Sequence, residues 1–120
     1  MERYTLGKIE RRFADLVWEL EPIASGELVK ICAKEFDWKK PTTYTVLRKM
    51  INKGLFVNEN SIVKAAISKE EFLARQSEEY VEESFGGSLP GFLVAFTSKK
   101  KLSEKEIQEL HRIIDESKEK

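Results

Sequence analysis

The segment DWKKPTTYTVLRKMINKG, from Asp37 to Gly54, decides the predicted fold. Its apolar side chains recur at three- and four-residue steps, which is typical of one buried helical face. They are Val46, Leu47, Met50 and Ile51. Pro41 suits the first turn of this helix, because an N–H there would have no helical partner anyway. Gly54 suits the position just after the helix, where a left-handed conformation is favoured. The segment therefore predicts a helix that starts near Pro41 and ends before Gly54.

The same segment is strongly basic, although the whole chain is neutral, with 21 Lys/Arg against 21 Asp/Glu. Residues 38–67 carry six Lys/Arg against one Asp/Glu, a net charge of +5. Residues 1–37 carry six against eight, and residues 68–120 carry nine against twelve, so both flanks are acidic. Five positive charges without nearby acids on one helix indicate a polyanion that meets one surface only.

Short polar residues between these charges are of the kind that read base edges in the DNA major groove. The predicted base contacts are Thr42, Tyr44, Thr45 and Arg48. The predicted phosphate contacts are Lys39, Lys40, Lys49 and Lys53. Phosphate contacts fix the position of a protein on DNA, whereas base contacts carry sequence specificity.

Two helices precede this segment and a short hairpin follows it. Residues 7–20 show one apolar stripe, and Ser25 suits the N-cap of a second helix that runs to Phe36. Residues 55–57 and 62–67 are β-prone and flank a turn-like stretch. Three helices followed by a hairpin predict a winged helix, with the third helix in the major groove. The alternative is a plain three-helix bundle with a basic surface helix.

Residues 69–120 predict further helices, since Ser68 and Ser103 each begin a capping-box pattern. Their apolar surface is too large for so small a unit to bury, and this favours burial against a second copy. The predicted dimerisation residues are Phe72, Tyr80, Val81, Phe85, Leu89, Phe92, Leu93, Phe96, Ile107, Leu110 and Ile114. The alternative is that the tail folds back onto the first domain. The predicted fold is mainly α with a small β-hairpin: a winged helix-turn-helix domain, residues 1–68, and a helical dimerisation domain, residues 69–120.

Residues that could support catalysis or bind a cofactor are scarce. His111 stands alone among charged residues, and general acid–base catalysis needs a partner within reach. Cys32 is the single cysteine, so neither a disulfide nor a Cys/His zinc site is expected. We therefore expect no enzyme, no metal and no cofactor. The absence of an 18-residue apolar run and of a signal peptide predicts a cytoplasmic protein without membrane insertion.

Six short motifs in the same order resemble the penicillinase and methicillin-resistance repressors over nearly the full chain. The motif residues are Leu6, Glu10 and Trp18; Trp38, Thr42, Thr45 and Leu47; Lys53 and Gly54; Ser68 to Phe72; Phe85 to Ser88; and Leu102, Ser103, Glu106, Ile107 and Leu110. The resemblance implies a homodimeric transcriptional repressor on a palindromic operator of double-stranded DNA. In the antibiotic-resistance branch, it also implies release by a membrane sensor protease that cleaves near an Asn-Phe pair. Ala95-Phe96 occupies that place here, so this mode of induction is weakened.

Two other departures from the family narrow the prediction. The C-terminal cysteine cluster of the copper-responsive branch is absent, which disfavours copper sensing. The hairpin is short and carries only Lys64 as a basic residue, so we expect the third helix to make most of the DNA contacts. Two other functions stay open: a winged-helix module that binds an acidic protein, and a regulator that senses a small molecule between the tail helices.

Overall fold

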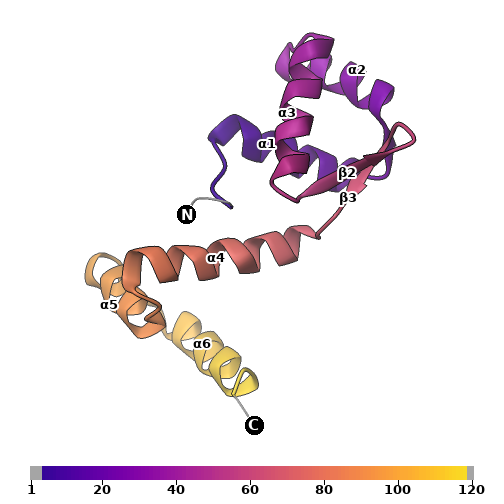
Figure 1. Cartoon of the computed structure of the whole chain (residues 1–120). Coiled ribbons are helices and arrows are strands. Elements are labelled where there is room, and N and C mark those ends of the chain that lie inside the picture. The colour runs from indigo at the N-terminus through magenta and orange to yellow at the C-terminus, as the bar shows by residue number, and fades with distance from the viewer. Residues whose placement is uncertain (1–3, 119–120) are drawn as a thin grey trace. The chain divides into compact units, whose positions relative to one another are not determined.

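The computed structural model describes residues 4–118 and confirms the predicted fold class (Figure 1). The chain forms two compact units, of which the first ends at Tyr80 and the second begins at Val81. This division lies within one helix, α4, which spans Lys69–Phe85. The predicted boundary between residues 68 and 69 coincides with the start of α4, and as a functional boundary it stays a prediction.

The first unit has the winged-helix order of elements (Figure 1). Its elements are α1 (Lys8–Leu20), β1 (Ile23–Ala24), α2 (Ser25–Phe36), α3 (Lys40–Asn52), β2 (Phe56–Glu59) and β3 (Ile62–Ala65). The strands form an antiparallel sheet in the order β1-β3-β2, in which Ile23 pairs with Val63 and Asn58 pairs with the same residue from the other side. The sequence did not indicate β1, because two residues are too few to show an alternating pattern.

The hairpin between β2 and β3 turns over two residues, Asn60 and Ser61. Both have positive φ angles, 53° and 63°. A two-residue loop with both residues left-handed matches the twist of the strands on either side, and asparagine tolerates this conformation well. This hairpin, which is the wing of the winged helix, is therefore as short as the sequence predicts.

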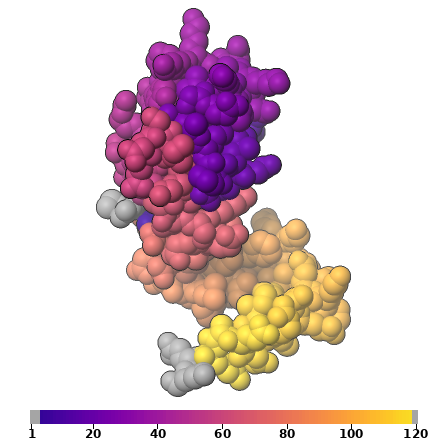
Figure 2. Space-filling view, turned by 90° about the vertical axis from the view of Figure 1, so that its right-hand side faces the viewer, coloured from indigo at the N-terminus to yellow at the C-terminus, as the bar shows by residue number. Residues whose placement is uncertain are grey.

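The core of the first unit collects apolar side chains from all three helices and the hairpin. The indigo-to-magenta atoms of Figure 2 show one outer face of this unit. The fully buried large side chains include Phe13, Val17, Leu28, Leu47, Met50, Leu55, Phe56 and Val63. Trp18 connects α1 to the hairpin and to the segment that follows it. Its ring centroid lies 5.3 Å from that of Phe56 in β2, and its indole N–H donates to the Ile67 carbonyl at 3.1 Å. Ile9, predicted on the buried stripe of the first helix, is 45% exposed.

The first turns of α4 belong to the first unit and pack against α1 through Phe72. This ring is fully buried, with its centroid 5.3 Å from Trp18 and 6.1 Å from Tyr4. The backbone of Tyr4 is also bound to α4, since its N–H donates to Glu79 Oε1 at 3.2 Å and its carbonyl accepts from Gln76 at 2.9 Å. The sequence placed Phe72 among the dimer contacts, but a fully buried ring offers no surface to a second chain.

The second unit consists of the end of α4 and two further helices, α5 (Leu89–Lys99) and α6 (Glu104–Glu116). Both predicted serine caps at the start of α4 and α6 are present: Ser68 Oγ accepts from Glu71 N at 3.0 Å, and Ser103 Oγ accepts from Glu106 N at 3.1 Å. The apolar run predicts a fifth helix from Leu89 to Phe96. In the structure, Ser88 caps the start of α5, and the helix continues beyond Phe96 to Lys99. Within residues 4–118, no helix is long and apolar enough to cross a membrane.

Candidate nucleic-acid interface

Helices α2 and α3 form a helix-turn-helix whose turn is fixed by Asp37 and Trp38. Asp37 adopts the left-handed conformation, φ 57°, and so ends α2 abruptly. The Trp38 ring then packs 4.7 Å from Phe36 and 5.8 Å from Phe13, measured between ring centroids. Helix α3 therefore starts from a turn that is anchored to both α1 and α2.

Helix α3 has one buried face and one outward face. Thr43, Leu47 and Met50 are buried at helical spacing and attach α3 to the core. The outward face is defined by the exposed residues Thr42, Thr45, Arg48, Lys49 and Asn52. Ser25, which the sequence predicts as the N-cap of α2, is instead its first residue, and its hydroxyl accepts a hydrogen bond from Tyr44 of α3 at 3.1 Å.

The four predicted base-contact residues are not equally available. Thr42 and Arg48 are exposed on the outward face. Thr45 is exposed too, but its hydroxyl donates to the Pro41 carbonyl at 2.9 Å. Tyr44 is half-buried and its hydroxyl is bound to Ser25, so it braces α2 against α3. Thr42, Thr45 and Arg48 therefore share the outward face of α3, and Tyr44 is not part of that face.

The sequence alone suggested that no acid lies near the basic residues of α3, but one of these residues does have an acidic partner. Lys49 Nζ lies 2.5 Å from Glu10 Oε2 of α1, and Lys53 Nζ donates to the Thr5 carbonyl at 3.3 Å. By contrast, Lys39, Lys40 and Arg48 form no ion pair with any residue that the structure describes, and all three are exposed. The unpaired positive charges thus lie at the start and in the middle of α3.

Glu10 is a residue whose role in this site the sequence pattern did not reveal. Its second carboxylate oxygen, Oε1, accepts from the Gly7 backbone N–H at 3.0 Å, which caps the first turn of α1. The hydrogen bond from Lys49, followed by that from Gly7, lowers the pKa of the Glu10 carboxyl, and the charge of Lys53 acts in the same direction. Glu10 is therefore a fixed negative charge next to the outward face of α3.

The wing adds little positive charge to this surface. Its single lysine, Lys64, lies in β3 and its Nζ is 3.0 Å from Glu59 Oε1 of β2. An exposed pair of this kind is worth little in stability, but it does cancel the charge of the lysine locally. That α3 makes most of the DNA contacts stays a prediction.

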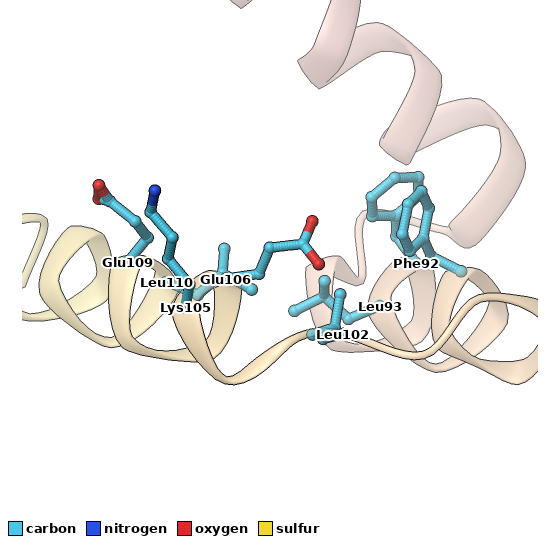
Figure 3. A pocket seen from close by; sticks show the side chains of 8 residues that line it. Phe92, Leu93, Leu102, Lys105, Glu106, Glu109 and Leu110 are labelled. Carbon is cyan, nitrogen blue, oxygen red and sulfur yellow. The ribbon is translucent and has the colours of Figure 1, made fainter.

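The predicted dimerisation residues other than Phe72 have accessible side chains. Tyr80 is the last residue of the first unit, and the others lie in the second unit. From Val81 to Ser117, no described side chain is classed as buried, although α5 is almost wholly apolar. Phe92, Leu93, Leu102 and Leu110 line an open groove between α5 and α6 (Figure 3). Phe96 also lines this groove, and its side chain is 44% exposed. The Ala95-Phe96 pair lies inside α5, and both side chains are exposed.

The described residues hold no group of three or more potential metal-ligating side chains. Cys32 is buried, and this burial raises the pKa of its thiol, with a smaller opposing effect from the Thr43 hydroxyl beside it. The two groups do not meet in hydrogen-bonding geometry, so Thr43 Oγ1 stays without a partner. His111 is exposed on α6.

Comparison with known proteins identifies the family. The family model described as "Penicillinase repressor" matches residues 6–116. A penicillinase repressor of Bacillus licheniformis is 24% identical over 107 residues, which cover 86% of this chain and 84% of that protein. The methicillin resistance regulatory protein MecI of Staphylococcus aureus is 20% identical over 116 residues, 93% of this chain and 94% of that protein. MecI of Mammaliicoccus sciuri is 19% identical with the same coverage. The chain belongs to the penicillinase repressor family, whose members are transcriptional repressors and not enzymes.

Proposed function

We propose that the protein is a homodimeric, DNA-binding transcriptional repressor that inserts α3 into the major groove of a palindromic operator. The observation that carries this proposal is the outward face of α3, where Arg48 and two threonines lie together, with Lys39 and Lys40 exposed at the helix start. A helix with this surface offers a guanidinium for guanine, hydroxyls for base edges and cations for phosphate.

The roles of individual residues follow from their accessibility. Arg48 reads a base, because it is exposed and has no ion pair among residues 4–118 that would hold it back. Thr42 and Thr45 contact base edges or thymine methyl groups at the same face. Lys39 and Lys40 hold phosphate, and Tyr44 supports the angle between α2 and α3 through its bond to Ser25.

Dimerisation through the second unit is supported by its exposed apolar surface. Leu89 is 56% exposed, Val94 71% and Ile114 52%, and no residue of α5 or α6 is buried. Apolar surface on this scale is typical of an interface and not of a solvated face. A two-fold dimer also presents two copies of α3 to a two-fold operator, so two modest half-site affinities add.

The test is a binding titration by fluorescence anisotropy, with a random duplex and with the operator that footprinting finds in the protein's own promoter. We expect log K to fall steeply and linearly with log salt concentration for both duplexes, and the operator to bind more tightly. Arg48→Ala should reduce the preference for the operator by about 1–3 kcal/mol and leave random-duplex binding largely intact.

A flat salt dependence would contradict the proposal and favour a protein-interaction module. Glu35→Ala serves as a matched control, because Glu35 is exposed on α2, outside the outward face of α3. An unchanged operator preference in the Arg48 variant would remove Arg48 from the base-reading set.

We also propose that a membrane sensor protease releases the repressor by cleavage at Ala95-Phe96. Both side chains are exposed, but the bond lies within a helix, so cleavage requires α5 to open locally. Co-expression with a sensor protease should give a fragment that ends at Ala95, read by mass spectrometry. An intact chain under inducing conditions would contradict this mode of release.

A further inference from the structure

Beyond this function, the ion pair between Lys49 and Glu10 brings an acidic side chain of α1 next to α3, the helix proposed to enter the major groove. We propose that Glu10 limits the affinity of the protein for DNA of any sequence by holding the Lys49 ammonium away from phosphate. This inference rests on the proposed DNA binding and concerns a residue that lies outside the helix-turn-helix.

Lys49 belongs to the surface that DNA would meet. It lies on the outward face of α3 between Thr45, one turn before it, and Asn52, one turn after it, and its side chain is 57% exposed. A lysine here can reach DNA phosphate when α3 enters the groove. In the free protein, however, its ammonium is already in contact with the Glu10 carboxylate.

Glu10 is held in place independently of Lys49. One carboxylate oxygen accepts from the Gly7 N–H at 3.0 Å, and only the other meets the ammonium. The Glu10 side chain is 21% exposed, less than half the exposure of its partner. Most exposed ion pairs contribute little because both side chains are mobile, but here one partner is prepositioned by the helix cap.

The Glu10 carboxylate also changes the charge that DNA would meet. When Lys49 turns to a phosphate, it leaves the Glu10 carboxylate next to the nucleic acid backbone, where the charge of Lys53 still acts on that carboxylate. The net positive charge offered to phosphate at this place is therefore smaller than the count of lysines suggests. Because phosphate binding does not depend on sequence, this effect lowers the affinity for random duplex and for operator alike.

Glu10→Gln is the decisive variant. The glutamine side-chain oxygen can still accept from Gly7, so the cap is kept while the negative charge is removed. We expect the slope of log K against log salt to become steeper by about 0.9, the value for one additional neutralised phosphate. At 0.1 M salt this corresponds to an affinity for random duplex that is higher by about eightfold.

Two controls separate this effect from a general change in charge. Glu19→Gln removes one acid from an exposed position of the same helix, more than two turns away, and should leave the slope unchanged. In the Lys49→Gln background, Glu10→Gln should steepen the slope by well under half of its effect in the wild type, because the lysine it releases is no longer present. Thermal unfolding of each variant shows whether the fold is kept.

The results distinguish this inference from the proposed function. If the wild type binds duplex with a steep salt slope but Glu10→Gln leaves slope and affinity unchanged, the affinity-limiting role is refuted and DNA binding stands. Equal effects of Glu10→Gln and Glu19→Gln would refute it as well. If the wild type shows no salt-dependent binding, both proposals fail together. Should Glu10→Gln unfold, Lys49→Gln decides: a loss of a full phosphate contact, about 0.9 in slope, would mean that Glu10 masks nothing.

Discussion

Replacement of Phe72 by alanine tests whether the start of α4 belongs to the winged-helix unit. The Phe72 ring is fully buried, so its removal loses about 1.5–3 kcal/mol of hydrophobic transfer free energy. The contacts with Trp18 and Tyr4, at 5.3 and 6.1 Å between centroids, add about 0.5–1.5 kcal/mol each. The total agrees with the loss of about 3–5 kcal/mol that is usual when a buried phenylalanine is truncated.

The assay is denaturant unfolding followed by tryptophan fluorescence. Trp18 and Trp38, the two tryptophans of the chain, both lie in the first unit, so their emission reports on that unit. We expect Phe72→Ala to lower the free energy of unfolding by about 3–5 kcal/mol. The neighbouring Leu73→Ala serves as control, since Leu73 is 37% exposed and its loss should cost about 1 kcal/mol or less.

Sedimentation equilibrium completes the test, because the same variants can be compared as dimers. We expect Phe72→Ala to leave the monomer–dimer equilibrium of the folded protein unchanged, whereas Phe96→Ala in α5 should weaken it. A stability loss below about 1 kcal/mol together with a weaker dimer would refute the reasoning. It would indicate that Phe72 lies in the dimer interface.

Three further predictions concern buried or charged groups of the first unit. Thr43→Val should leave the free energy of unfolding unchanged or raise it by up to about 1 kcal/mol, because the Thr43 hydroxyl is buried without a partner; a clear loss would reveal a partner. Cys32 should react with iodoacetamide roughly tenfold or more slowly in native buffer than in denaturant, since burial raises the pKa of its thiol; equal rates would contradict this. The pKa of Glu10 is lowered in the folded state, so its contribution to stability is full above the unfolded value of about 4.3 and is lost as the pH falls through the folded value. The stability difference between wild type and Glu10→Gln should therefore shrink from pH 7 to pH 3, and a constant difference would argue against a charge effect.

Most of the fold could be predicted because its signals are local. The helix from Lys40 to Asn52, its entry through Pro41 and its end before Gly54, φ 87°, follow from residues that are close in sequence. The serine caps at positions 68 and 103 are equally local, since a hydroxyl and an amide three residues apart satisfy each other. Ser25 was assigned one residue out of place, which is the usual uncertainty of a helix end.

The candidate site was only partly predictable, since exposure on a helix is periodic but the partner of a side chain is not. The spacing of apolar residues correctly put Thr42, Thr45 and Arg48 on the outward face. It could not tell that the Tyr44 hydroxyl is bound to Ser25, because that contact depends on the angle between two helices. The same limit applied to Phe72, which has the spacing of a tail residue but packs in the first unit.

By itself, the sequence determined the order of the helices and of the two hairpin strands, the basic character of α3, the short wing and the apolar surplus of the tail. These depend on propensity, periodicity and composition, which act over a few neighbouring residues. Only the tertiary structure decided that Glu10 of α1 meets Lys49 of α3, and that Tyr4 and Arg75, 71 positions apart, are hydrogen bonded. Such pairs arise where packing brings distant segments together, and the rotation of one helix against another leaves no periodic trace in the chain. The basic helix that the sequence predicts is therefore real, but how much of its charge DNA would meet is set by an acid on a different helix.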